Sequence, residues 1–202
     1  MHIFISPEQP ETNIVDQTVR VLERDGVIVY PTDTIYGLGC SLASKKAIKK
    51  IYQLKRREQN KPFSFICADL SMIGRYAVVS KAQFKLLKAY LPGPYTFILE
   101  AGEEAPKEVL PRKKRATVGI RIPDHPVPLA LVKRLGVPII TTSVNVSGED
   151  AYGNPEVMEE RFGKQIDIIL DAGILPKEPS TVIDLTGAEP VVIRQGKGQF
   201  SF

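Results

Sequence analysis

Residues 27–40 read VIVYPTDTIYGLGC, an apolar run that leads into a cluster of small hydroxyl residues. The first four residues lie between Gly26 and Pro31, and an apolar run bounded in this way is typical of a buried strand. Upstream, apolar residues recur at helical spacing from Ile14 to Leu22, which predicts a helix that ends at Gly26. A helix followed by a strand with a polar end is therefore the first unit of the fold.

Helical and strand patterns alternate along the rest of the 202 residues. Further helices are predicted around 45–52, at about 69–76 and 80–91, from Pro126, and from Pro155 to Gly163. Strands are predicted at 63–68, 95–101, 116–123, 138–144, 167–173, 180–186 and 190–196. Strands alternate with helices early and cluster late, without a linker or repeat. This order predicts a single α/β domain over residues 1–202, with a mixed sheet and flanking helices.

The composition is that of an ordinary globular protein, with 43% hydrophobic and 25% charged residues. The N-terminal stretch turns polar after Ile5, and no run of about 18 apolar residues occurs, so neither a secretory signal nor a membrane helix is predicted. Cys40 and Cys67 are the only cysteines, and without an export signal we expect them reduced in the interior. The expected location is the cytoplasm.

Positive charge is concentrated in one part of the chain. Residues 44–61 hold six Lys and two Arg against one Glu, a local charge of +7 in a chain whose net charge is +4. In the helix around 45–52, the lysines fall on the face opposite its apolar residues; they are Lys45, Lys46, Lys49 and Lys50. Such a face attracts the phosphates of RNA, and it also serves simply as a solvated helix surface. The sequence leaves both interpretations open.

Three stretches, 31–34, 141–148 and 179–184, place small hydroxyl residues at the ends of apolar strands. Ligands of α/β sheets bind where strands end, and hydroxyls there donate hydrogen bonds to phosphate or carboxylate oxygens without burying charge. Each stretch alone is also explained by turns and helix caps. Together they predict one polar ligand site.

Basic residues in or beside these strands supply the charge that hydroxyls lack. Arg121 and Arg194 interrupt strands that otherwise read as buried, so each is expected to meet an acid or to face a ligand cleft. Lys55 and Arg57 follow a helix and suit phosphate contact, whereas Arg56 would point the other way in an extended segment.

Several common mechanisms lack their motifs. The chain contains no G-x-x-x-x-G-K-[ST] phosphate loop, no G-x-G-x-x-G fingerprint and no G-x-S-x-G elbow. Zinc ligands at workable spacing are absent, and no metal site is predicted. Asp33 and Asp184 are positioned either to touch a magnesium ion that accompanies a nucleotide or to stabilise turns.

Taken in order, six segments resemble the YrdC/YciO family: VIVYPTDTIYGLGC, IYQLKRREQNKP, PGPYTFIL, ATVGIRIPDHP, TTSVNVSG and PSTVIDLTGAEPVVIRQGKG. The second and fifth carry what look like the signature elements of the family, K-x-R at Lys55 to Arg57 and S-x-N at Ser143 to Asn145. The resemblance implies a twisted mixed sheet with flanking helices around a deep, positively charged cavity.

The resemblance also implies an activity and its substrates. Enzymatic members make threonylcarbamoyl-adenylate from L-threonine, bicarbonate and ATP, with Mg²⁺ accompanying ATP, for the threonylcarbamoyl modification of tRNA. By motif position the threonine part would be held by Thr34, Arg121 and Thr141. The nucleotide would be held by Lys55, Arg57, Lys61, Thr117, Ser143, Asn145 and Arg194. Catalysis would rest on Lys55, Arg57, Ser143 and Asn145, which position and neutralise charge without a nucleophile.

Two departures bring the chain closer to the YciO branch of the family. Enzymatic members often carry a histidine in the strand after K-x-R, where this chain has SFIC at 64–67, and a common downstream serine is replaced near Ala151. The alternative function is therefore binding of double-stranded RNA, tRNA or rRNA, with nucleotide binding kept and threonine chemistry altered or lost. The lysine face at 45–50 would then contact the RNA.

Overall fold

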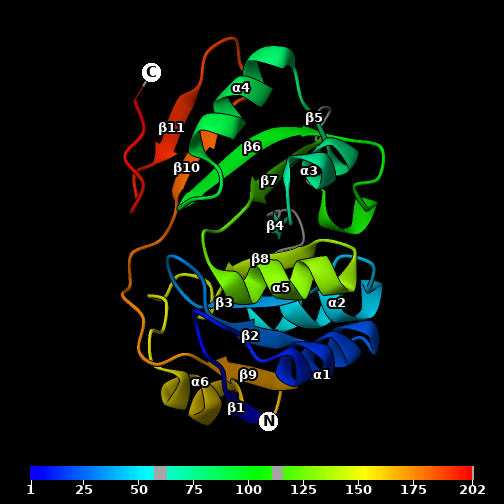
Figure 1. Cartoon of the computed structure of the whole chain (residues 1–202), viewed down its shortest axis with the longest axis vertical. Helices are drawn as coiled ribbons and strands as arrows, with labels where there is room; N and C mark the ends of the chain where they lie inside the picture. Colours follow the sequence, from blue (N-terminus) through cyan, green and yellow to red (C-terminus); the bar gives the residue numbers. More distant parts are fainter. Residues whose placement is uncertain (57–62, 111–115, 202) are drawn as a thin grey trace.

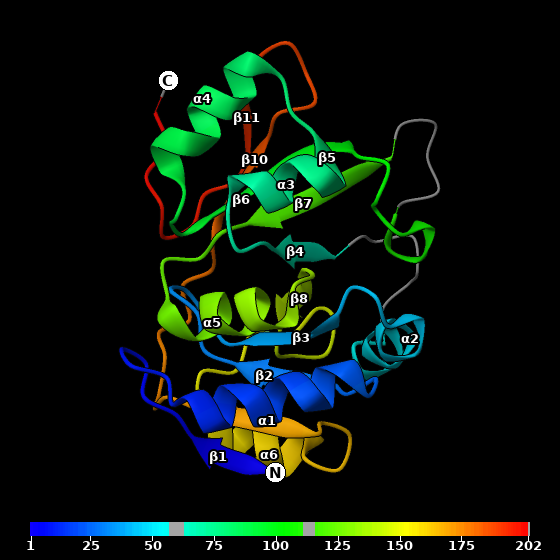
Figure 2. The same ribbon diagram turned by 45° about the vertical axis from the view of Figure 1, so that its right-hand side comes forward.

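The structure is a computed structural model that describes residues 1–56, 63–110 and 116–201. Within these ranges, eleven strands form one mixed sheet, and helices lie along both of its faces (Figures 1 and 2). The strands are β1 His2–Phe4, β2 Ile28–Tyr30, β3 Gly37–Ser41, β4 Ser64–Ile66, β5 Ala77–Val78, β6 Tyr95–Ala101, β7 Thr117–Arg121, β8 Ile139–Ser143, β9 Ile168–Asp171, β10 Thr181–Asp184 and β11 Val191–Arg194. The helices are α1 Thr12–Glu23, α2 Lys45–Leu54, α3 Leu70–Tyr76, α4 Lys81–Tyr90, α5 Pro126–Leu135, α6 Pro155–Phe162 and the short 3₁₀ helix η1 Lys107–Val109.

The sheet is continuous from one end of the molecule to the other, as Figure 1 shows. Its strand order is β1-β9-β2-β3-β8-β4-β7-β6-β10-β11, and β5 pairs with β6. Parallel pairs at β4/β7 and β6/β10 alternate with antiparallel pairs at β4/β8 and β6/β7. The predicted mixed sheet is therefore confirmed. None of the described helices is long and apolar enough to cross a membrane.

Alternating side chains of the strands pack into two separate cores. Val27 and Val29 belong to a cluster that includes buried side chains of α2, α3, α4 and α6, whereas Ile28 and Tyr30 belong to a cluster that includes α1 and α5. Successive residues of a strand point to opposite faces, so these four residues divide between the two clusters. In Figure 2, α1 and α5 lie over the part of the sheet formed by β2, β3 and β8.

The predicted helices are confirmed, and several of their ends are capped. The side chain of Ser80 accepts a hydrogen bond from Gln83 N at 3.2 Å, and the Gln83 side chain accepts one from Ser80 N. Asn154 caps α6 in front of Pro155. Gly136 ends α5 with a φ of 76°, a value that favours glycine.

The predicted strands are confirmed, but β1, β3 and β5 were not predicted. The sequence of β3 is GLGCS, and glycine weakens the strand pattern. Both of its glycines are required by close approach: a Cβ at Gly39 would lie 2.3 Å from Ile140 O, and one at Gly37 would lie 2.8 Å from the Tyr30 ring. Tertiary packing therefore outweighs the low strand propensity of this segment.

The buried environment expected for the strand around Arg194 is wrong. β11 pairs with β10 at the end of the strand order, and Val191, Val192 and Ile193 are all exposed. An apolar run predicts burial only when other elements cover both faces of its strand, and the position at the sheet edge leaves β11 uncovered.

The prediction for the two cysteines is confirmed. Cys40 and Cys67 are both buried and free. Burial raises the pKa of the Cys67 thiol to about 12 and also raises the pKa of Cys40, so both thiols stay protonated.

Candidate functional site

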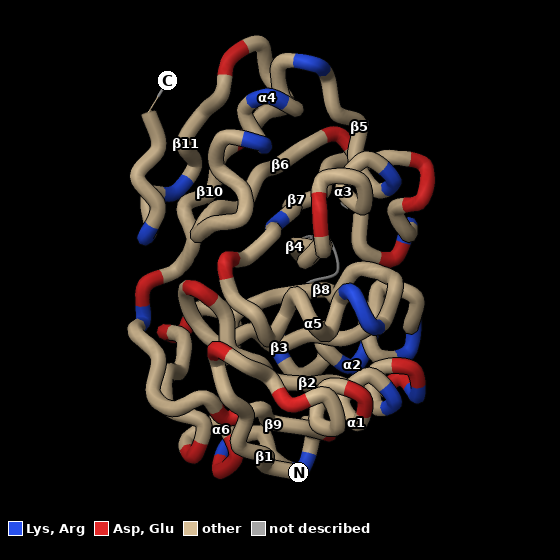
Figure 3. The backbone as a smooth tube through the Cα atoms, viewed as in Figure 1, with Lys and Arg blue, Asp and Glu red and all other residues tan. Residues whose placement is uncertain are grey.

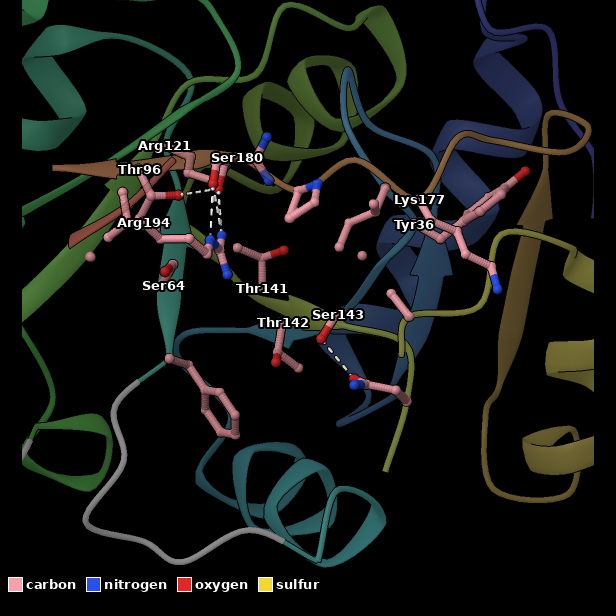
Figure 4. A pocket seen from close by; sticks show the side chains of 18 of the residues that line it. Tyr36, Ser64, Thr96, Arg121, Thr141, Thr142, Ser143, Lys177, Ser180 and Arg194 are labelled. Carbon is pink, nitrogen blue, oxygen red and sulfur yellow. Dashed lines mark hydrogen bonds between the residues drawn. The ribbon is translucent and has the colours of Figure 1, made fainter. Parts of the chain in front are cut away.

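A cavity of about 660 Å³ opens along the central strands of the sheet (Figure 4). Strands β3, β4, β6, β7, β8, β10 and β11 contribute to its lining, together with the loops at 35–36, 145–151 and 177–180. The three hydroxyl-rich stretches converge here: Thr141 and Ser180 line the cavity, and Thr34 contacts the lining residue Arg121. Residues from the three strand ends therefore meet at one cavity, as expected from their sequence.

Small residues in register create the space. Thr141 of β8 pairs with Ser64 of β4, Ser64 pairs with Gly119 of β7, and Gly119 pairs with Ile98 of β6. The alternate residues of the same strands, Ile140, Phe65, Ile120 and Phe97, are fully buried in the core on the other face. A Cβ at Gly119 would lie 2.7 Å from Ser64 Oγ. At these positions the large residues fill one face of the sheet, and Thr141, Ser64 and Gly119 leave room on the other.

Arg121 places a buried positive charge in the cavity wall. Its side chain is 7% exposed, and its Nη2 donates to Asp33 Oδ1 at 2.8 Å and to Thr34 Oγ1 at 3.0 Å. Its Nε is buried and has no hydrogen-bond partner among the described residues. Burial lowers the pKa of Arg121, and the charge of Asp33 opposes that shift. The arginine therefore both meets an acid and lines the cavity, and its Nε is left without a partner among the described residues.

A second polar cluster lies at the end of β8. Lys55 is 2% exposed, and its Nζ donates to Ser143 O at 2.7 Å, to Ser143 Oγ at 3.4 Å and to Asn145 Oδ1. Ser143 Oγ also donates to Asn145 Oδ1 at 2.6 Å. The K-x-R lysine and the S-x-N pair, which lie 88 and 90 residues apart in sequence, thus form one hydrogen-bonded unit.

The backbone turns sharply where α2 ends, which separates Lys55 from Arg56. Lys55 is the C-cap of α2 and has right-handed backbone angles, whereas Arg56 has a φ of 47° and is exposed. The interpretation of this segment as extended is therefore wrong at 55–56: a left-handed turn, not strand alternation, points the two side chains apart. Arg57 and Lys61 lie outside the described residues.

A third cluster joins the cavity to the edge of the sheet. Arg194 Nη2 donates to Ser180 O at 2.8 Å, and Ser180 Oγ lies 2.8 Å from Thr96 Oγ1, as the dashed lines in Figure 4 show. Partial burial, and then the charge of Arg121, lower the pKa of Arg194. Two arginines from β7 and β11 therefore face the same cavity.

The residues expected at the site fall into three groups. Those that line the cavity are Thr117, Arg121, Thr141, Ser143, Asn145 and Arg194. Thr34 and Lys55 are buried and contact lining residues, but they are not part of the lining. Asp33 pairs with Arg121, and Asp184 Oδ1 accepts a hydrogen bond from Thr186 N at 2.8 Å in a turn. The expected turn role is therefore seen for Asp184, whereas Asp33 forms a buried ion pair instead.

Two residues of the lysine face are already paired with acids. Lys45 Nζ lies 2.6 Å from Glu108 Oε1, and Lys50 Nζ lies 3.0 Å from Asp167 Oδ2. Lys46 and Lys49 are exposed and make no ion pair with any other described residue. The face predicted to contact RNA therefore presents two charges that no described acid neutralises.

Sequence reasoning missed several lining residues, among them Ser64, Thr96, Tyr36 and Lys177. Ser64 and Thr96 could have been found as small polar residues inside otherwise apolar strands. The prediction considered only residues at the ends of strands. Tyr36 has a different anchor: its OH donates to Gly173 O at 2.6 Å and accepts from Ala172 N at 3.0 Å. Figure 4 labels Tyr36 and Lys177 among the residues that line the cavity. The hydrogen bonds of Tyr36 to residues 172 and 173 cannot be read from sequence spacing.

Comparisons with known proteins agree with this architecture. The Sua5/YciO/YrdC family model, described as "Telomere recombination", matches residues 20–196. YciO of Escherichia coli, described as uncharacterized, is 39% identical over 96% of this chain and 95% of its own, and its crystal structure superposes with a TM-score of 0.93 over 98% and 97% of the two chains.

Relatives named for an activity also match along most of the chain. A putative threonylcarbamoyl-AMP synthase of Methanocaldococcus jannaschii is 31% identical over 96% of this chain and 91% of its own. The crystal structure of P. abyssi Sua5 complexed with L-threonine has a TM-score of 0.90 at 29% identity, covering 97% of this chain and 57% of that one. The chain belongs to the Sua5/YciO/YrdC family, which includes threonylcarbamoyl-AMP synthases.

Proposed function

We propose that the protein joins a carbamoylated amino acid to AMP, using ATP and bicarbonate, and that L-threonine is the first amino acid to test. The product would then serve the threonylcarbamoyl modification of tRNA. The observation that carries the proposal is Arg121, whose buried Nε has no partner among the described residues while its Nη2 is held by Asp33. A cationic side chain that lines a cavity and has an unpaired donor suits a carboxylate ligand.

The dimensions and chemistry of the cavity support this class of substrates. Its volume of about 660 Å³ lies within the range of small-ligand sites. Its described lining includes hydroxyls on Ser64, Thr96, Thr141 and Ser180, which orient oxygen-rich ligands without adding charge. The relatives named as threonylcarbamoyl-AMP synthases and the threonine complex of Sua5 support the same assignment.

The proposed roles follow from the three polar clusters. Arg121 would bind the carboxylate of the amino acid, with Thr141 as a neighbouring donor. The amine would combine with bicarbonate, forming a C–N bond as water is lost. The resulting carbamate would attack the α-phosphorus of ATP, so that one P–O bond forms as the bond to pyrophosphate breaks. Ser143 and Asn145, held by Lys55, and Arg194 would position the phosphates and offset their charge. The roles proposed for Arg57 and Lys61 concern residues outside the described ranges.

Magnesium is proposed to enter with the phosphates of ATP. Asp33 is a poor ligand for it because both carboxylate oxygens are engaged, one by Arg121 and the other by Asp124 N at 3.2 Å. Asp184 accepts hydrogen bonds from Thr186 and is not part of the described cavity lining. No protein ligand is therefore proposed for the metal ion.

The segment that lacks a histidine affects which amino acid is used. In β4, Ser64 lines the cavity while Phe65 and Ile66 are fully buried. The cavity-lining side chain of this strand is therefore the hydroxyl of Ser64, in a strand where enzymatic relatives often carry a histidine. We propose that this difference changes selectivity for the amino acid side chain more than it changes binding of the nucleotide.

The test is pyrophosphate release. The protein is incubated with ATP, Mg²⁺, bicarbonate and each amino acid in turn, beside a threonylcarbamoyl-AMP synthase as a positive control. We expect release with at least one amino acid, and we expect Arg121→Gln to reduce it by about 10- to 100-fold, since a hydrogen bond to a charged group is removed. Arg134→Gln is the matched control, because that arginine is on α5 and forms a surface ion pair. Absence of release with every amino acid, while the positive control is active, would contradict the proposal.

A second candidate function is binding of structured RNA, as a separate activity or together with the first. It is favoured by the exposure of Lys46 and Lys49 on α2, the helix that ends at the buried Lys55. An enzyme that acts in tRNA modification would use the helix face for RNA and the cavity for ATP. Its test is charge reversal at Lys46 and Lys49, with the salt dependence of duplex RNA binding as the readout.

A further inference from the structure

A second hollow lies between α3 and α4 and shares no described lining residue with the cavity. Its volume is about 490 Å³, and most of its lining is apolar. Ile73 and Leu87 form buried parts of it, whereas Phe84 remains 46% exposed. A concave apolar surface that leaves an aromatic ring in water is typical of a binding site for a protein segment. We call this feature the α3–α4 groove.

Exposed lysines lie along one side of the α3–α4 groove. Residues 70–91 contain four basic residues and no acidic one, and Arg75 is paired with Glu104 at 2.8 Å, which leaves Lys81, Lys85 and Lys88. Lys81 and Lys85 line the groove, and Lys88 lies one further turn along α4. These three lysines are exposed and make no ion pair with another described residue. Figure 3 shows the resulting row of blue segments along α4.

Gly74 supplies an independent indication. Glycine is disfavoured inside a helix relative to alanine, yet Gly74 lies within the seven residues of α3 and lines the groove. A Cβ at this position would meet nothing within 4 Å, so packing among the described residues does not require glycine. A missing side chain in the wall of a groove allows close approach by another backbone. The position therefore favours an occupant from outside the described residues.

These observations distinguish between classes of partner. A concave groove accepts side chains that project from a helix, whereas a flat lipid surface leaves it unfilled. The apolar lining excludes a partner that binds through phosphates alone, and the lysines at its rim favour acidic residues. α4 has ten residues, a length of about 15 Å, which matches about three turns of a partner helix.

We propose that the α3–α4 groove is a docking site for an acidic amphipathic helix of a partner protein. The apolar side chains of that helix would fill the groove beside Phe84 and over Gly74. Its acidic residues would pair with Lys81 and Lys85. The proposal does not depend on the reaction at the cavity, because the two sites share no described lining residue.

The test uses synthetic peptides of about 16 residues, long enough to form a helix in solution. One peptide carries leucines at positions i, i+3, i+4 and i+7 with glutamates beside them, and a second has lysines in place of the glutamates. Fluorescence anisotropy measures binding to the full chain, and ¹⁵N–¹H NMR spectra identify the amides that shift. We expect the acidic peptide to bind with shifts confined to α3, α4 and their connection, and at least about tenfold more tightly than the basic one.

Variants of the groove keep the proposal falsifiable. Gly74→Met places a side chain in the groove and should weaken binding of the acidic peptide about tenfold, whereas Gly74→Ala adds only a methyl group and should change it little. The double charge reversal Lys81→Glu with Lys85→Glu should invert the preference between the two peptides. Equal binding of Gly74→Met and Gly74→Ala would overturn the proposal.

Two further binding experiments test whether a membrane or an RNA occupies the groove instead of a protein helix. Vesicles of phosphatidylglycerol with phosphatidylcholine and a duplex RNA are tested against the same variants. A Phe84→Asp substitution that abolishes vesicle binding but not peptide binding would assign the groove to membranes and overturn the proposal. If Gly74→Met abolishes binding of the RNA and leaves binding of the peptide unchanged, the groove is assigned to RNA and the proposal is overturned. Pyrophosphate release is measured in parallel, and an unchanged rate in Gly74→Met separates this result from the activity of the cavity.

Discussion

Two arginine–aspartate pairs of similar geometry lie in very different parts of the molecule. Arg121 and Asp33 meet at 2.8 Å in the cavity wall, where both side chains are 7% exposed. Arg134 and Asp16 meet at 2.7 Å on the surface of α5 and α1, where the side chains are 62% and 31% exposed. Distance alone would rank the two pairs as equal.

The difference shows that burial decides what an ion pair does. In water, each surface charge remains solvated when its partner is removed, so the pair contributes little. In the cavity wall, removal of one partner leaves a charge without solvation or compensation. Loss of one partner of the buried pair is therefore expected to have a large effect, whereas removal of the surface pair has a small one.

The largest effect is expected from Asp33→Asn. This substitution leaves the buried charge of Arg121 uncompensated and should lower the free energy of unfolding by about 3–5 kcal/mol. Urea denaturation followed by circular dichroism measures the change. The double variant Asp33→Leu with Arg121→Met removes both charges and should recover most of the stability. If Asp33→Asn changed the free energy of unfolding by less than about 1 kcal/mol, the pair would have to be solvated by water, and the prediction would be wrong.

A second prediction concerns the exposed charges of Lys46 and Lys49 and their proposed binding of duplex RNA. Lys46→Glu with Lys49→Glu should weaken binding of duplex RNA and make its salt dependence shallower, by about 0.9 in the log–log slope for each phosphate that the variant no longer neutralises. Anisotropy titrations at several salt concentrations measure this slope. ATP binding should be unchanged, whereas Arg121→Gln should leave RNA binding unchanged. An unaltered slope would contradict the assignment of RNA to this face.

A third prediction uses an ion pair of intermediate burial. His2 Nδ1 lies 2.6 Å from Glu159 Oε2, and His2 Nε2 lies 2.7 Å from Asp171 Oδ2, with the His2 side chain 17% exposed. The hydrogen bond with Glu159, and then that with Asp171, raise the pKa of His2. Its stabilising contribution is therefore complete below the usual pKa of 6.5 and is lost as the pH rises through the folded pKa.

The measurement is the free energy of unfolding between about pH 5.5 and 8 in wild type and His2→Gln, whose difference should shrink as the pH rises. His125 is the matched control, because burial lowers its pKa and its contribution has the opposite sign. His125→Asn keeps a residue able to cap α5 and should show a difference that grows as the pH rises. A constant difference for His2→Gln across the range would refute the assignment.

The smallest effect is expected from Arg134→Gln. Removal of this exposed pair should change the free energy of unfolding by less than about 1 kcal/mol, and added salt should reduce the difference further. Urea denaturation at low and high salt measures both. A change as large as that of Asp33→Asn would remove the distinction between the buried pair and the surface pair.

Sequence reasoning was most successful where a signal is local. The helical spacing from Ile14 to Leu22 predicted α1, and Asn154 with Pro155 predicted the start of α6. The prediction failed at β3, because its glycines give no strand signal. Glycine is needed there because a Cβ would clash with Tyr30 or with Ile140. A contact between distant segments leaves no local pattern to detect.

The candidate site shows the same division. Hydroxyl-rich strand ends pointed to Thr141 and Ser180, and the arginine within an apolar strand pointed to Arg121. Ser64 and Thr96 lie inside strands and were missed, although both line the cavity. Arg194 was expected in a buried strand and lies on an exposed one. The composition of a strand does not indicate its place in the strand order.

The sequence by itself determined the helices, most of the strands, the basic segment and the residue types able to bind an anion. These depend on periodicity, caps and charge, which operate over a few residues. Only the tertiary structure decided that Thr141, Ser64 and Gly119 lie side by side, that Lys55 meets Ser143, and that α3 and α4 enclose a groove. The reason is that pairing between strands and packing between helices depend on residues far apart in the chain, whose register no local pattern specifies.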